Sequence, residues 1–136
     1  MNGSPKSPAS RSLILVVEDE AQLSKLFVEV LTEAGYEVVP ADSVTDALST
    51  LSYQHFDAAV LDIELRDGPV FPVADKLAAL GTPFLFASAV YFQMVPKQHQ
   101  GTPFVGKPFN IEELVARVED AVQRGRSGPP FGKAAE

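Results

Sequence analysis

The stretch LILVVEDE at residues 13–20 decides the fold, because an apolar run is followed at once by acidic residues. The pattern recurs in AAVLDIEL at residues 58–65, where Asp62 follows the apolar run. Short runs rich in Val, Ile and Leu are typical of buried parallel strands. We therefore predict an α/β fold in which Glu18, Asp19 and Asp62 stand where strands end.

The rest of the chain alternates in the same way. Strands are predicted at residues 13–17, 36–40, 58–61, 83–87 and 103–105, and helices at 21–34, 43–53, 70–80 and 111–123. Residues 89–102 show no clean helical face, so a short or irregular fourth helix is expected there. Such βα units give a parallel sheet with helices on both faces. Residues 1–11 and 125–136 are predicted to be disordered, which leaves one domain at residues 12–124.

Composition excludes several classes of protein. A length of 136 residues suits one domain, and a net charge of -7 argues against a nucleic-acid partner. The absence of cysteine excludes disulfides and thiolate metal sites. No apolar run is long enough for a bilayer span, and the N-terminus lacks a secretory signal pattern. We expect a cytoplasmic domain without membrane insertion.

The acidic residues are expected to form one site. Ligands of open α/β sheets bind outside the carboxyl ends of the strands, where Glu18, Asp19 and Asp62 would meet. Lys107 follows the last predicted strand and precedes Pro108. Clustered carboxylates repel one another, and a hard divalent cation relieves that repulsion. The pattern predicts a metal and phosphoryl site.

Four segments in this order resemble the receiver domain of two-component response regulators: LILVVEDE (13–20), VLDIELRDG (60–68), FLFASA (84–89) and FVGKPF (104–109). The resemblance covers residues 12–124. It implies a flavodoxin-like, doubly wound five-stranded sheet with strand order 2-1-3-4-5.

The resemblance also implies a set of site residues. Asp62 would be the phosphoacceptor that forms an aspartyl-phosphate. Asp19, Asp62 and the backbone carbonyl of Glu64 would bind Mg²⁺ directly. Glu18 would act largely through water; many members have Asp at its position, and its longer side chain leaves direct coordination open.

Further roles follow from the same resemblance. Lys107 would pair with phosphoryl oxygens, and its bond to Pro108 would be cis. Ser88 would hydrogen-bond the phosphoryl group and move on activation. Phe104 matches the switch aromatic of the family, with ordinary core packing as an equal alternative.

Other residues near the site have less defined roles. Glu64 and Val90 would flank the path of the attacking water, and the small Ala89 would leave room for the phosphoryl group. The two histidines, His55 and His99, are expected on the surface without a ligand role.

The resemblance implies a phospho-accepting response regulator rather than a turnover enzyme, with slow autodephosphorylation. A sensor histidine kinase or a histidine phosphotransfer protein would donate the phosphoryl group to Asp62 in the presence of Mg²⁺. We expect no attached effector domain, so that output passes to a downstream protein target by contact. The domain would act as a monomer or as a phosphorylation-dependent dimer.

Three alternatives stay open at this point. The first is a receiver-fold interaction module that is not phosphorylated. The second is a hydrolase of the haloacid dehalogenase type, although such enzymes carry Asp-x-Asp at the first strand. The third is a flavodoxin-like FMN protein, although the acidic residues 18–20 would repel a phosphate there.

Overall fold

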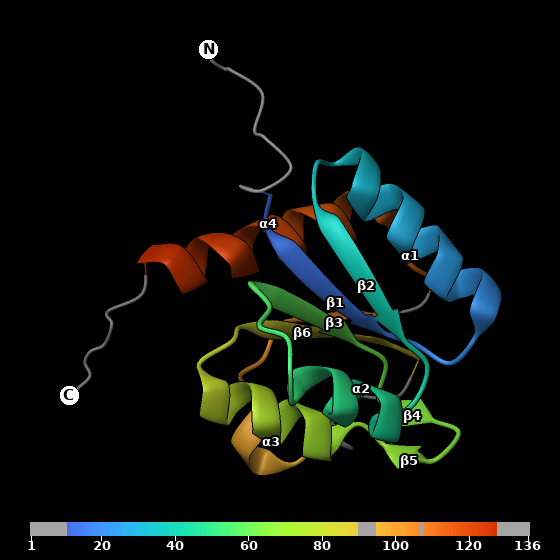
Figure 1. The fold of residues 1–136 in the computed structure, drawn as a ribbon. Helices are drawn as coiled ribbons and strands as arrows, with labels where there is room; N and C mark the ends of the chain where they lie inside the picture. The colour runs from blue at the N-terminus through green and yellow to red at the C-terminus, as the bar shows by residue number, and fades with distance from the viewer. Residues whose placement is uncertain (1–10, 90–94, 107, 128–136) are drawn as a thin grey trace.

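Five parallel strands form the central sheet of the computed structural model (Figure 1), which describes residues 11–89, 95–106 and 108–127. They are β1 (Leu13–Val17), β2 (Glu37–Ala41), β3 (Ala58–Leu61), β6 (Phe84–Ser88) and β7 (Phe104–Gly106). Their order is β2-β1-β3-β6-β7. Since β6 and β7 are the fourth and fifth strands of this sheet, the predicted order 2-1-3-4-5 is confirmed.

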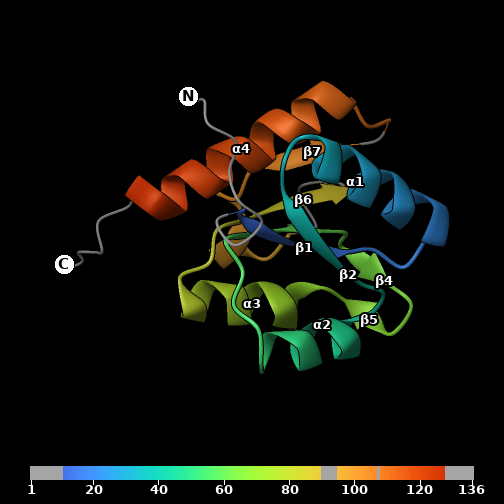
Figure 2. The same ribbon diagram turned by 45° about the horizontal axis from the view of Figure 1, so that its top comes forward.

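Helices cover both faces of the sheet (Figure 2). On one face lie α1 (Ala21–Glu33) and α4 (Ile111–Ser127), and on the other lie α2 (Val44–Leu51) and α3 (Phe71–Leu80). Alternate residues of β1 serve the two layers. Ile14 and Val16 share a buried cluster with side chains of α1 and α4, whereas Leu15 and Val17 share one with side chains of α2 and α3. Burial on both faces is why this strand is apolar at every position.

A small hairpin separates β3 from α3. Its strands are β4 (Glu64–Leu65) and β5 (Gly68–Pro69), which pair antiparallel. Gly68 has a φ of 133°, a region that residues with a Cβ rarely adopt. The sequence predicts a turn around residues 67–69; the structure places the turn at Arg66 and Asp67, and Gly68 and Pro69 form β5.

The last helix is longer than predicted. It continues through Ser127, so residues 125–127 are helical and the predicted start of the disordered tail is wrong. A Cβ on Gly125 would lie 3.2 Å from Pro83 Cγ. Here the glycine permits a close approach of α4 to the chain before β6, rather than ending the helix. Residues 1–10 and 128–136 lie outside the described residues.

A short helical turn lies within the part of residues 89–102 that the structure describes, where the sequence predicts a short or irregular helix. Within residues 95–102, the regular structure consists of the single 3-10 turn η3 (Lys97–His99). Residues 90–94 lie outside the described residues.

His99 is buried, so its predicted place on the surface is wrong. Only 5% of it is exposed, and its ring stacks on Phe71 at 6.4 Å between centroids while lying edge-on to Phe84 and Phe86. Its Nε2 lies 2.7 Å from Asp75 Oδ1 on α3, and because a carboxylate only accepts, the ring nitrogen donates. This contact fastens the β6–β7 connection to α3.

The polar neighbours of His99 in the sequence explain the wrong prediction. Gln98 and Gln100 are exposed, and nothing in the local pattern indicates that η3 turns the histidine inward. His55 is exposed, as predicted.

We predict that His99→Ala lowers the free energy of unfolding by about 2–4 kcal/mol, since it removes a buried ring and the partner of Asp75. Urea unfolding followed by circular dichroism measures this loss. His55→Ala is the matched control and should change the value by less than about 0.5 kcal/mol. Equal effects of the two substitutions would contradict the buried role of His99.

Candidate functional site

The C-terminal ends of β1 and β3 lie side by side and carry the acidic residues. The register pairs Val17 with Leu61, the last residues of the two strands. Beyond them, the N–H of Asp62 donates to the carbonyl of Val17 at 2.9 Å, which continues the pairing past β3. Glu18 and Asp19 follow Val17 directly. Parallel pairing therefore brings three carboxyl groups to one edge of the sheet.

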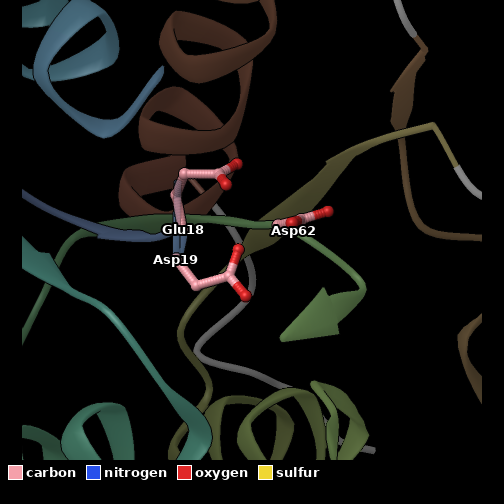
Figure 3. Close-up of side chains that lie close together, drawn as sticks. All are labelled: Glu18, Asp19 and Asp62. Carbon is pink, nitrogen blue, oxygen red and sulfur yellow. The ribbon is translucent and has the colours of Figure 1, made fainter. Parts of the chain in front are cut away.

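The three carboxyl groups converge (Figure 3). One oxygen from each of Glu18, Asp19 and Asp62 lies within 4.8 Å of the others. Glu18 is buried, whereas Asp19 and Asp62 are half-buried. Two unit charges at this separation repel by about 3–4 kcal/mol at an effective dielectric constant of about 20. The edge therefore concentrates negative charge that a bound cation would offset.

Backbone hydrogen bonds hold Glu18 in place. Its Oε2 accepts the N–H of Glu20 at 2.9 Å, which closes the turn into α1. Its own N–H donates to the carbonyl of Ala41 at 3.0 Å, which ties the end of β1 to the end of β2. One carboxylate oxygen of Glu18 is thus engaged with the backbone, an arrangement that suits a ligand acting through water.

The donor set fits a magnesium ion. Mg²⁺ prefers oxygen ligands and binds through one or two carboxylates while keeping several waters. The half-buried Asp19 and Asp62 combine a fixed backbone with a solvent-facing side where such waters fit. In the part of the chain that the structure describes, this is the one group of three acidic or histidine side chains with ligand-like spacing.

The acidic edge is also accessible from the side of α1. Glu18 and Asp19 line an open groove of about 720 Å³ between α1 and the end of β2. Lys25 and Arg66 lie among its walls and add positive charge to an otherwise acidic surface. A small ion or a donor group can therefore reach this side of the site from solvent.

Ser88 and Phe104 lie on the neighbouring strands. Ser88 ends β6 and is 2% exposed, and β6 pairs with β3, so the residue lies at the same edge as Asp62. Phe104 begins β7 and packs against Phe86 with centroids 6.5 Å apart. Ala89, directly after Ser88, is exposed. The structure thus brings Ser88 to the acidic edge and packs the half-buried Phe104 against the adjacent core.

Two of the predicted site residues, Lys107 and Val90, lie outside the described residues, and the Lys107–Pro108 bond does so with them. Lys107 follows Gly106, the last residue of β7. Glu64 opens β4 and is exposed. The coordination of a metal by its backbone carbonyl stays a prediction.

Asp67, at the tip of the hairpin, has a role that the sequence analysis missed. Its Oδ1 accepts the N–H of Val44 at 2.8 Å, and its Oδ2 accepts the N–H and the hydroxyl of Thr45, each at 3.0 Å. These hydrogen bonds, with that from the Thr45 N–H the largest cause, lower the pKa of Asp67 from its ordinary value. The Asp67-Gly68 pair indicates a turn, but no local signal reveals a helix cap on a distant segment.

A model of the response regulator receiver domain matches residues 14–119 of the chain. The chain belongs to the response regulator receiver family. This assignment sets aside the hydrolase and FMN-protein alternatives, which belong to other families.

Curated relatives agree with this assignment. The chain is 34% identical over 120 residues to the transcriptional regulatory protein TcrA of Mycobacterium tuberculosis, covering 82% of this chain and 46% of that protein. It is 33% identical over 120 residues to the swarming motility regulation protein RssB of Serratia marcescens, covering 85% and 54%. The receiver thus spans about half the length of these relatives.

Solved receiver structures share the fold. A CheY-like receiver domain from Methanospirillum hungatei superposes with a TM-score of 0.79 at 22% identity, over 86% of this chain and 98% of that one. The response regulator TrrA of Thermotoga maritima, solved in complex with Mg²⁺-BeF, gives a TM-score of 0.73 at 27% identity, over 81% and 98%. Among the described residues of this receiver, no helix has the length and apolarity that a membrane crossing needs.

We predict that Asp19→Asn raises the stability of the metal-free receiver, because it removes one of three mutually repelling charges. The same substitution should reduce the gain in melting temperature that saturating Mg²⁺ gives the wild type, since binding to the folded state is the source of that gain. Thermal unfolding with and without Mg²⁺ measures both effects.

Glu119→Gln, on the exposed side of α4, controls for the change in net charge. It should leave the Mg²⁺-dependent gain as in the wild type. A gain that persists unchanged in Asp19→Asn would show that the ion binds elsewhere.

The cap formed by Asp67 predicts a pH dependence. Because the folded-state pKa lies below the ordinary value of an aspartate, the carboxylate contributes stability above that ordinary value, and the contribution is lost as the pH falls through the folded pKa. The urea midpoint of wild type should therefore exceed that of Asp67→Asn at pH 7, and the two should approach each other on strong acidification. A difference that is independent of pH would refute a role for the ionised carboxylate.

Proposed function

We propose that this protein is a phospho-accepting receiver in which Asp62 takes a phosphoryl group from a phosphohistidine. The observation that carries the proposal is the convergence of the Glu18, Asp19 and Asp62 carboxyl oxygens within 4.8 Å at the strand ends. A family match alone would also suit a receiver that had lost its acidic site. Retention of all three carboxyl groups favours phosphorylation over the unphosphorylated interaction module.

Asp62 is suited to the nucleophilic role. Its N–H is fixed to the carbonyl of Val17, and its side chain is half-buried, so the carboxylate is held in place yet reachable. In the proposed step a carboxylate oxygen attacks the phosphorus, the P–N bond to the donor histidine breaks, and the imidazole nitrogen keeps the electron pair. Positioning of the nucleophile is the main contribution of the fold to such a transfer.

Glu18 and Asp19 would hold the cation. Bound Mg²⁺ supplies positive charge that offsets the charge on the phosphoryl oxygens. Asp19 and Asp62 are the proposed direct ligands with the Glu64 carbonyl, and Glu18, with Oε2 on the Glu20 N–H, would act through water. The magnesium complex of the related TrrA supports the choice of metal.

Ser88, Lys107 and Phe104 would respond to the phosphoryl group. Ser88 would donate its hydroxyl hydrogen to a phosphoryl oxygen from the end of β6, and Lys107 would provide a point charge. The packing of Phe104 against Phe86, two residues before Ser88, supports a link between the site and the core. Phe104 as a switch stays a proposal beside its packing role.

The proposed partners are a sensor histidine kinase or histidine phosphotransfer protein as donor, and a downstream protein as target. The receiver would lose its phosphoryl group slowly by hydrolysis, without turnover of a metabolite. That output passes through protein contact without an attached effector domain stays a prediction, as do a cytoplasmic location and a monomer or phosphorylation-dependent dimer. The mass of the full-length protein isolated from its native cells tests the prediction that no effector domain is attached.

We predict a single Mg²⁺-dependent phosphoryl adduct when the protein is incubated with a small acyl phosphate. Asp62→Asn should abolish the adduct, because the amide is not a nucleophile, whereas the exposed Asp120→Asn should not. Intact-protein mass spectrometry measures the adduct.

The remaining outcomes discriminate between alternatives. Labelling that survives in Asp62→Asn would refute the assignment of the phosphoacceptor. Absence of both labelling and Mg²⁺ binding would favour the unphosphorylated interaction module. Binding of Mg²⁺ without labelling would call for a phosphorylated histidine phosphotransfer domain as the donor in a second assay.

A further inference from the structure

The first turn of α2 is capped by two separate segments of the chain. Ser43, the N-cap residue, accepts the N–H of Asp46 with its hydroxyl oxygen at 3.0 Å, a local cap of the usual kind. The N–H groups of Val44 and Thr45 instead donate to Asp67, which lies on the hairpin after β3. The hairpin that follows Asp62 is therefore fastened to α2 through the carboxylate of Asp67.

A second contact fastens the same hairpin. Arg66 lies beside Asp67, and its Nη2 is 3.1 Å from Asp42 Oδ2 in the connection between β2 and α2. Both side chains are more than half exposed, so this ion pair by itself contributes little to stability. Like the Asp67 contact, this ion pair holds the tip of the hairpin against the start of α2.

The segment that receives these contacts also supports the acidic edge. Asp42 follows Ala41, whose carbonyl accepts the N–H of Glu18. At its other end, the hairpin is closed near Asp62 by the N–H of Val70, which donates to the carbonyl of Ile63 at 2.9 Å. The connections after β1, β2 and β3 are thus joined by hydrogen bonds into one unit around the carboxyl groups.

We propose that Asp67 is a positioning residue for the metal and phosphoryl site. By holding the hairpin tip on α2, it fixes the segment from Asp62 through Glu64 in the conformation that the bound ion requires. The inference rests on the proposed function and deepens it, since it assigns the control of Mg²⁺ affinity to a residue that does not contact the ion.

The physical reason is the entropy of ordering a loop. Fixing the backbone of a free segment costs conformational entropy for every residue, and an ion that must order the segment when it binds has a lower affinity for that reason. Because the tip is already held on α2 before the ion binds, the entropy of ordering the segment is lost during folding and does not weaken ion binding. Partners that hydrogen-bond metal ligands without touching the metal typically affect its affinity by about 10–100-fold, and because Asp67 acts through the backbone of the hairpin, we expect the low end of that range.

A simpler reading is that Asp67 only stabilises α2, as any N-terminal cap does. The chain offers a matched control for this reading. Ser43→Ala removes the local cap of the same helix and so lowers its stability, but leaves the contact between helix and hairpin intact. Under both readings, loss of either cap lowers the stability of the protein. Only the positioning role predicts that loss of the Asp67 contact also weakens Mg²⁺ binding.

The test is calorimetric titration of Mg²⁺ into wild type, Asp67→Ala and Ser43→Ala, at a temperature at which circular dichroism shows all three to be folded. We expect the dissociation constant to rise about tenfold in Asp67→Ala and to stay within about twofold of wild type in Ser43→Ala. Asp67→Asn, which keeps one acceptor oxygen, should fall between wild type and Asp67→Ala. The initial rate of labelling by an acyl phosphate at sub-saturating Mg²⁺ should follow the same order.

An unchanged dissociation constant in Asp67→Ala would overturn the proposal, and so would equal weakening in Asp67→Ala and Ser43→Ala. The proposed function has a separate failure, in which wild type itself neither binds Mg²⁺ nor accepts a phosphoryl group. Normal binding and labelling by wild type, together with normal binding by Asp67→Ala, would leave the receiver chemistry intact and reject only the positioning role.

Discussion

The parallel pairing of β1 with β3 is the constraint on which the site depends. Because the register sets Val17 opposite Leu61, the carboxyl groups of Glu18, Asp19 and Asp62 must lie close together. Their charges repel by a few kcal/mol per pair. Each fully buried Val or Leu side chain contributes about 1.5–3 kcal/mol, and the two strands are buried almost throughout. Core burial therefore outweighs the repulsion, and the fold maintains the acidic edge.

The fold and the acidic part of the site were predictable because both follow from short-range patterns. Strands β1 and β3 are continuous apolar runs, and the residue after such a run in a parallel sheet lies at the ligand edge. The cap formed by Asp67 was not predictable, because its partners Val44 and Thr45 are distant in the sequence. A turn motif specifies its own backbone but not the surface on which its tip rests.

Burial of His99 and the length of α4 were missed for related reasons. In both cases a residue type that usually indicates one local structure, such as a surface position or a helix end, instead makes a contact with a distant part of the chain. His99 lies in a polar segment but fills a space between aromatic rings, and Gly125 lies within a helix because Pro83 approaches it closely. Local propensity is a weak guide at such positions, since tertiary packing overrides it.

Two of the features that the sequence did not reveal, the Asp67 cap and the buried His99, lie on the side of the sheet that α2 and α3 cover. Ser88 and Phe86 are two positions apart on β6 and so face the same side. The ring of Phe86 is packed among Phe71, Phe84, His99 and Phe104. A densely packed cluster cannot absorb a shift at one member without moving the others. We therefore expect a displacement of Ser88 to disturb the rings that hold α3 and the β6–β7 connection, whereas the contacts of Asp67 join the hairpin after Asp62 to α2.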